Sequence, residues 1–253
     1  MNQGKLKIAW FIDGKLGDCI LSCYSLLRLN LDLYEITVIT SSQNKNLIKE
    51  LKLPIKIIIL EKTLLSFLSR PKIKDIRKVN LFFNFSKFDI SINPFRWNSG
   101  SFFEQYIIKS RKRFNKFSIK NKINFSTHET KIHEQFFNLS KLSYKDNSEV
   151  VKYLKYETSI KENDVVIHPF SSEPSRCLSF ELIKKIISLL PNKRILIVGL
   201  PSDNKILIDQ LSIINKNNVK IDIKRRSFKS IVQILNNSKL VLASESFISH
   251  LAS

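Results

Sequence analysis

Apolar and polar positions follow a regular order along the chain, in which short apolar runs alternate with longer amphipathic segments. The nearly continuous apolar runs, which are typical of buried strands in a parallel sheet, cover 6–13, 35–40, 54–60, 88–95, 164–170, 193–200 and 239–245. The segments with helical spacing of apolar residues cover 18–30, 41–51, 127–142, 179–190, 201–214 and 227–237. This alternation predicts an α/β fold with parallel sheets.

Capping residues and a polar interruption refine this organisation. A serine N-cap is expected to open the helix at 41–51, and Pro201 is expected at the first position of its helix. The segment 144–164 is polar, and the alternation restarts after it. We therefore predict two Rossmann-like units, an N-terminal domain at 1–155 and a C-terminal domain at 160–253. Ligands of such sheets bind beyond the carboxyl ends of the strands, so an active site is expected in the cleft between the units.

Composition and charge narrow the classes of partner. The chain has 253 residues with 43% hydrophobic residues, which indicates a globular protein. It carries 42 Lys and Arg against 22 Asp and Glu, a formal net charge of +20, so an anionic partner is expected. The cysteines are Cys19, Cys23 and Cys177, and their spacing matches neither a disulfide framework nor a zinc site. With no signal-peptide pattern and no apolar run of ~18 residues, we predict a cytoplasmic protein without a bound metal.

The turn after the first strand reads Gly14-x-x-Gly17-Asp18. A dinucleotide site requires Gly-x-Gly-x-x-Gly, and a carboxylate at this position would repel a phosphate. Asp18 is therefore either an ordinary N-cap of the following helix or a carboxylate that accepts a proton from a substrate hydroxyl.

Two further polar stretches follow strands of the second unit. The stretch 168–176, HPFSSEPSR, has small hydroxyl residues and then a cation, which suits a phosphate site, although Arg176 is also explained as a solvated side chain. In the stretch 245–250, ESFISH, Glu245 and Ser246 are expected to cap the next helix, with His250 about one turn inside it.

The segment 109–124 is basic, without an acidic residue, and its cations alternate with apolar side chains. It is either a solvated edge of the sheet or a surface for an anionic partner, and its alternating aromatic residues also permit nucleic-acid binding. The segment carries no RNA-binding motif, so a nucleic-acid partner is not expected.

Four stretches in the same order resemble glycosyltransferase family 9, the ADP-heptose:lipopolysaccharide heptosyltransferases. GKLGDCILSCYSLLRL is similar to the opening Gly-x-x-Gly-Asp turn and helix of that family. VVIHPFSSEPSRCLSFELIKKI is similar to its His-Pro-Gly-Ala segment, and LIVGLPSDNKILI to its Gly-Gly-Pro-x-(Glu/Asp) segment. SFKSIVQILNNSKLVLASESFISHLA is similar to its Asp-(Ser/Thr)-Gly-x-x-His block. Arg176, Glu245 and Phe247 stand where the family has Lys, Asp and Gly. Heptose is therefore a poor expectation for the transferred sugar, but a nucleotide-sugar is still expected as the donor.

The resemblance implies a GT-B fold and an inverting, metal-independent transfer of a heptose or hexose from a nucleotide-diphosphate sugar, without a cofactor. The acceptor implied is a lipopolysaccharide core or a related lipid-linked glycan. Such an acceptor is compatible with peripheral contact of the protein with the anionic inner membrane. Asp18 is implied as the general base. The implied donor-binding residues are Ser171, Ser172, Arg176, Glu245, Ser246 and His250. The acceptor-binding residues expected from the basic segment are Lys109, Arg111, Lys112 and Arg113.

The chain ends three residues after His250, where the family normally continues. A C-terminally truncated donor domain is therefore expected. The alternatives to an active enzyme are a non-catalytic remnant that keeps the fold and a basic nucleic-acid-binding protein.

Overall fold

The computed structural model describes residues 4–12, 16–60, 87–94, 108–115, 118–119, 122–124, 126–127, 129–146 and 162–252. The chain divides into two compact units, Met1–Lys152 and Tyr153–Ser253. The predicted boundary at 155–160 lies outside the described residues, as does most of the polar segment around it.

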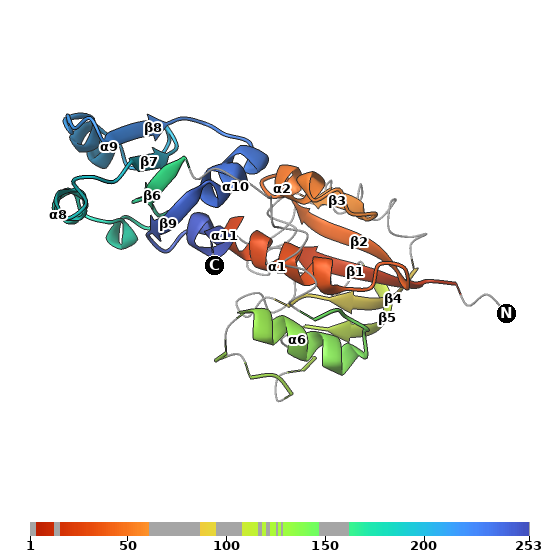
Figure 1. Ribbon diagram of the computed structural model, residues 1–253. Helices are drawn as coiled ribbons and strands as arrows, with labels where there is room; N and C mark the ends of the chain where they lie inside the picture. The colour runs from red at the N-terminus through yellow and green to blue at the C-terminus, as the bar shows by residue number, and fades with distance from the viewer. Residues whose placement is uncertain are drawn as a thin grey trace. The chain divides into compact units, whose positions relative to one another are not determined.

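The first unit is built on a parallel sheet of five strands in the order β3-β2-β1-β4-β5 (Figure 1). The strands are β1 (Leu6–Ile12), β2 (Tyr34–Ser41), β3 (Lys56–Leu60), β4 (Lys87–Ile92) and β5 (Lys109–Phe114). The described helices are α1 (Leu16–Arg28), α2 (Lys45–Glu50) and α6 (Glu129–Ser140). The chain runs outward from β1 to β3 and then returns to β4 on the other side of β1. The strand order therefore reverses between β1 and β4, which is where open α/β sheets bind ligands.

Helix α1 is held in place by α6. Ser25 Oγ on α1 and His133 Nδ1 on α6 are 2.5 Å apart, and both side chains are buried. Arg28 Nη1 donates to Glu134 Oε1 at 2.7 Å, with only 4% of the arginine side chain exposed. Trp10 of β1 is fully buried and packs against α6, with its ring 5.7 Å from that of Phe137. These contacts fix the position of α1, and with it the residues of its first turn.

The second unit is built on a parallel sheet of four strands in the order β8-β7-β6-β9. The strands are β6 (Asn163–His168), β7 (Ile195–Gly199), β8 (Val219–Ile223) and β9 (Ser238–Ala243). The helices are the 3-10 turn η1 (Pro174–Arg176), α8 (Phe180–Ser188), α9 (Lys205–Ser212), α10 (Phe228–Asn236) and α11 (Phe247–Ala252). Here the strand order reverses between β6 and β9.

Both faces of the second sheet are covered. Val165, Ile167 and Ile197 pack against α8 and α9, whereas the intervening Val166 and Leu196 pack against α10 and α11. Because successive strand residues point to opposite faces, strands covered on both sides have the continuous apolar runs seen in the sequence.

The predicted fold class is confirmed, and three details of the helices and strands are corrected. Asn44, without a side-chain cap hydrogen bond, precedes α2 in place of the expected serine. Helix α9 begins only at Lys205, because Asn204 accepts from Leu207 N and caps it, and Pro201 lies in the preceding turn. Strand β8 was not predicted, since its sequence VKIDI is short and alternates apolar with charged residues.

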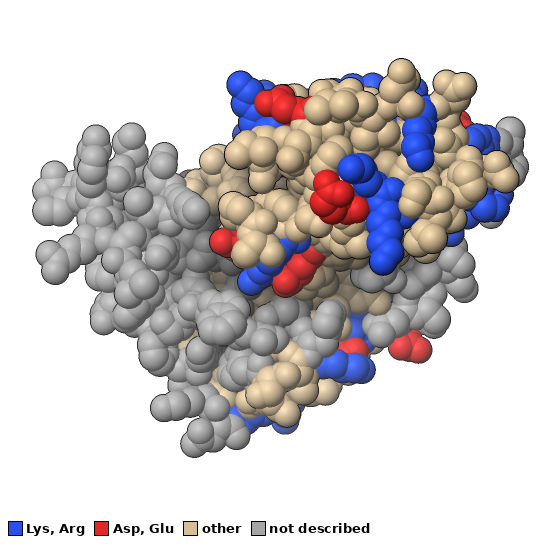
Figure 2. Space-filling model, turned by 90° about the vertical axis from the view of Figure 1, so that its left-hand side faces the viewer, with Lys and Arg blue, Asp and Glu red and all other residues tan. Residues whose placement is uncertain are grey.

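The charged side chains are mixed on the face of the molecule drawn in Figure 2. Lys and Arg are spread among uncharged residues there, and acidic side chains lie beside several of them. On the described part of this face, the excess positive charge is therefore not gathered in one patch. No helix among the described residues is long and apolar enough to cross a membrane.

Candidate donor site of the second unit and candidate catalytic carboxylate of the first

The loops after β6 and β9 meet at the point where the strand order of the second sheet reverses. Ser171, in the loop after β6, donates from Oγ to the carbonyl oxygen of Glu245, just after β9, at 2.9 Å. Arg176, in η1, places Nη1 3.2 Å from Glu245 Oε2. Three of the predicted donor-binding residues, distant in sequence, are therefore brought together at one edge of the sheet.

The ion pair between Arg176 and Glu245 is open to water. The two side chains are 53% and 67% exposed, and a pair of that kind contributes only about 0–1 kcal/mol to stability. An incoming anion can therefore replace the carboxylate as the partner of the guanidinium at little energetic cost. Ser172, beside Ser171, is also exposed.

His168, the last residue of β6, also contacts the residues that follow β9. Its Nδ1 lies 3.2 Å from Ser246 Oγ, and its ring meets the ring of Phe247 edge-on, with centroids 6.3 Å apart. Burial lowers the pKa of His168 to about 4, so the imidazole is neutral at pH 7. His250 lies one turn into α11, where its backbone N–H donates to the carbonyl oxygen of Ser246 at 3.4 Å.

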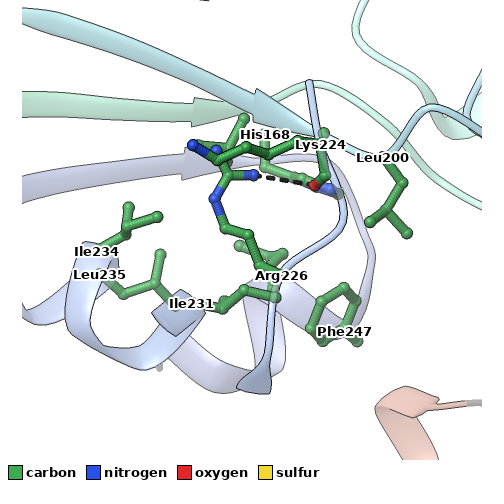
Figure 3. Close-up of a pocket in the computed structure, with 11 residues that line it drawn as sticks. His168, Leu200, Lys224, Arg226, Ile231, Ile234, Leu235 and Phe247 are labelled. Carbon is green, nitrogen blue, oxygen red and sulfur yellow. Dashed lines mark hydrogen bonds between the residues drawn. The ribbon is translucent and has the colours of Figure 1, made fainter. Parts of the chain in front are cut away.

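A pocket opens at this edge, between the ends of β6, β7 and β8 and helix α10 (Figure 3). Its empty volume is about 370 Å³, including space open to solvent. Figure 3 shows Ile231, Ile234 and Leu235 of α10 together on one side, with Phe247 at the start of α11 nearby. The pocket thus has a largely apolar wall.

Two cations line the same pocket. Arg226 is bound by Asp222 and donates from Nη1 to the carbonyl oxygen of Lys224 at 3.2 Å. Lys224 Nζ lies 3.3 Å from Asp222 Oδ2. Burial by itself would raise the pKa of Asp222, but the hydrogen bonds from Arg226 and Lys224 outweigh it, and the carboxyl pKa is lowered. The carboxylate therefore stays ionised and holds both cations at the pocket.

Gly199, at the end of β7, lines this pocket, but the place of its missing Cβ faces the core on the α8 and α9 side of the sheet, away from the pocket wall formed by α10. A Cβ atom there would overlap Cε2 of Phe170 and would lie 3.0 Å from Cδ1 of Ile223. Because Phe170 is 1% exposed, its ring has nowhere to move without a change in the surrounding core.

Asp18 lies in the first unit, in the first turn of α1. The helix begins at Leu16, so Asp18 is inside it and is not its N-cap residue, which removes that alternative. A carboxylate in a first turn is favoured by the helix dipole. The side chain is partly buried and follows β1, the strand at the reversal of the first sheet. Gly14 lies outside the described residues.

The four basic residues predicted to bind an acceptor lie on β5, the edge strand of the first sheet. Three of them, Lys109, Arg111 and Arg113, line a hollow together with residues of β1 and β4. Lys112 is exposed and is not among the lining residues. Lys109 opens its strand, whereas Asp18 follows the carboxyl end of β1, so the structure places these residues toward opposite ends of the strands.

Sequence reasoning did not identify His168, Gly199, Lys224 or Arg226 as site residues. The last two follow β8, the strand that the apolar pattern failed to predict, so nothing marked them as lying at the end of a strand. Among the described residues, no group of three or more His, Cys, Asp or Glu is arranged to hold a metal ion.

Comparison with solved structures places this architecture among known ones. Escherichia coli heptosyltransferase WaaC with ADP superposes with a TM-score of 0.71 at 13% identity, over 98% of this chain and 84% of that one. The same enzyme with ADP-2-deoxy-2-fluoro heptose gives 0.72 at 14% identity, over 98% and 85% of the two chains. A family 9 glycosyl transferase from Veillonella parvula gives 0.65 at 13% identity, over 100% and 78%.

The chain has a GT-B fold. The fold that the sequence resemblance implied is thereby confirmed, and the solved structures that share it include heptosyltransferases. No model of a protein family matches the sequence, and no curated protein matches it. At this level of sequence identity the likeness is one of fold.

Proposed function

We propose that this protein is a glycosyltransferase that moves a sugar from a nucleoside diphosphate to a hydroxyl group of a glycan. The observation that carries the proposal is the gathering of Ser171, Arg176, Glu245 and Ser246 beside an apolar pocket at the strand-order reversal of the second sheet. The similar WaaC structures contain ADP or an ADP-sugar, which supports a nucleotide as the ligand.

In the donor complex, the base would lie against the apolar wall formed by α10 and Phe247. The diphosphate would lie at the loop after β6, where Arg176 exchanges Glu245 for a phosphate oxygen and Ser171 donates a hydrogen bond. The released Glu245 is then free to accept hydrogen bonds from hydroxyl groups of the sugar. The guanidinium would also stabilise the negative charge that develops on the departing diphosphate.

Asp18 would act as the general base. Its carboxylate takes the proton from the acceptor hydroxyl while the hydroxyl oxygen bonds to the anomeric carbon of the sugar. The bond between that carbon and the diphosphate oxygen breaks in the same step, so the products are the glycoside and the nucleoside diphosphate. A single displacement of this kind inverts the anomeric centre and needs no metal ion in the proposed scheme.

The acceptor is proposed to be a lipopolysaccharide core or a related lipid-linked glycan, at the cytoplasmic face of an anionic membrane. Strand β1 measures roughly 17 Å from Lys7 to Ile12. An acceptor that touches both Asp18 and the cations that open β5 must therefore be extended. Heptose and hexose both stay candidates for the transferred sugar.

The proposal is tested by thermal unfolding of the full chain with ADP, UDP, GDP and CMP, each with its free nucleoside as control. A ligand at a hundred times its Kd stabilises the folded state by about 2.7 kcal/mol, which corresponds to a rise in Tm of about 5–10 °C. We expect one nucleoside diphosphate to give such a rise and its nucleoside much less. Cooperative melting without a shift for any nucleotide would support a non-catalytic protein that keeps the fold.

A further inference from the structure

A strongly basic hollow lies at the other end of the strands from the proposed catalytic carboxylate. We call it the basic hollow. Its cations come from three neighbouring strands of the first sheet: Lys7 of β1, Lys87 of β4, and Lys109, Arg111 and Arg113 of β5. Lys87 and Lys109 are the first residues of their strands, and Lys7 is the second residue of its strand.

A single carboxylate, that of Asp89, lines the basic hollow, and its oxygens are already engaged. Oδ2 accepts from the backbone N–H of Lys7 at 2.9 Å, and Oδ1 lies 3.7 Å from Nη1 of Arg111. Arg113 is held by the chain itself, because Nη2 donates to the carbonyl oxygen of Ile108 at 2.9 Å. Asp89 therefore offsets about one of the five positive charges.

The remaining lysines repel one another. Lys87 and Lys109 are direct partners in the register of β4 and β5, and like charges directly opposite on adjacent strands destabilise a sheet. Among the described residues, no carboxylate lies within ion-pair distance of either lysine side chain. The arrangement is unfavourable for the free protein, and an anion between the two side chains would relieve it.

The shape of the surface adds to the effect of the charge. A recess lined by charges of one sign concentrates the potential more than a flat surface does. The guanidinium of Arg111 is 85% exposed, so it is accessible to form a bidentate contact with phosphate oxygens. The mixed charges on the face of Figure 2 contrast with this clustering of one sign.

We infer that the basic hollow binds a ligand carrying two or more phosphate groups. This site is separate from the proposed donor site, which lies in the second unit, and does not depend on it. Phosphate groups of a lipid headgroup and of a soluble phosphorylated molecule share the chemistry that the hollow recognises.

The test compares Lys87→Gln/Lys109→Gln in the full chain with a control of equal charge, Lys216→Gln/Lys220→Gln. The control lysines are exposed and lie in the second unit, before and within β8. Binding is measured calorimetrically with tripolyphosphate, and by sedimentation with phosphatidylcholine vesicles that contain or lack phosphatidylglycerol. Because Lys87 and Lys109 are exposed, their replacement leaves the core intact, and the melting temperature of each variant verifies this.

We expect the hollow variant to lose roughly tenfold or more in affinity, since a lysine at an anionic surface contributes about 1 kcal/mol, and the control to lose at most about twofold. Tripolyphosphate binding with this selectivity supports the site with a soluble phosphate ligand. Binding only to the phosphatidylglycerol vesicles, with the same selectivity, supports it with a lipid headgroup. Equal losses in the two variants, or no binding of the wild type to either probe, would overturn the inference.

Discussion

Replacing Gly199 with alanine tests whether the close packing at the end of β7 leaves no room for a side chain. The added Cβ would overlap Cε2 of Phe170, would lie 2.8 Å from its Cδ2 and would lie 3.0 Å from Cδ1 of Ile223. Real Cβ atoms rarely approach another heavy atom so closely, so the Phe170 ring must shift within a wall that is already packed.

The cost follows from the overpacking of a buried site. An inserted methyl group that forces a core ring to move destabilises a protein by about 1–3 kcal/mol. For a chain of this length, that lowers Tm by about 2–12 °C. The Phe170 ring and the new methyl group lie on the α8 and α9 side of the sheet, whereas the pocket wall is formed by α10, so the stability should fall much more than the affinity for the nucleotide.

The assay is thermal unfolding, with Gly4→Ala as the matched control because a Cβ at Gly4 has no heavy atom within 4 Å. Phe170→Leu supplies a second comparison. It removes part of the ring that the methyl group meets, so Gly199→Ala should cost less in that background than in the wild type. If Gly199→Ala and Gly4→Ala melt at the same temperature, the steric reasoning is refuted.

Three further predictions concern charged and titrating groups. Asp18→Asn should abolish sugar transfer while nucleotide affinity, measured by calorimetry, stays unchanged; transfer at the wild-type rate would remove the base assignment. Glu245→Gln should bind the nucleoside diphosphate roughly two- to fivefold more tightly, because Arg176 loses its exposed partner, and weaker binding would contradict this. Burial holds the pKa of His168 at about 4, below the unfolded value of about 6.5, so unfolding free energy should fall by up to about 3 kcal/mol as pH drops through that window. Between pH 7 and pH 4, the Tm of the wild type should therefore fall more steeply with decreasing pH than the Tm of His168→Gln. Equal slopes of Tm against pH would falsify the lowered pKa of His168.

The sheets were predictable from the sequence because both are parallel and the strands of the second are covered on both faces. Runs such as the one ending at Ile12 are apolar at nearly every position, which is the pattern of a strand buried on both sides. Strands β5 and β8 are the exceptions. Each lies at the edge of its sheet and is not fully buried, so charged residues such as Arg111 in β5 and Lys220 in β8 are tolerated and the apolar signal disappears.

The candidate site was predictable only where a residue lies in the loop that follows a recognised strand. Ser171, Arg176 and Glu245 met this condition, and the structure brings them together. The pairing of His168 with Ser246 depends on which strands are neighbours, which the apolar pattern does not specify. The acceptor-binding role of the β5 cations stays a prediction, because strand direction places Lys109 toward the end of the sheet away from Asp18.

Calorimetric titration of the wild type, Arg176→Ala and Arg194→Ala with the nucleoside diphosphate that most raises Tm tests the donor site most directly. Arg194 is a matched control, because it is 59% exposed, pairs with Asp164 and directly precedes β7. It therefore lies at the amino-terminal ends of the strands of the same sheet, whereas Arg176 lies beyond their carboxyl ends. We predict that Arg176→Ala weakens binding by roughly tenfold or more, as expected for loss of a charge-assisted contact to phosphate, while Arg194→Ala leaves it unchanged. Equal affinities for all three proteins, or no binding of any nucleoside diphosphate to the wild type, would contradict a donor site at this edge.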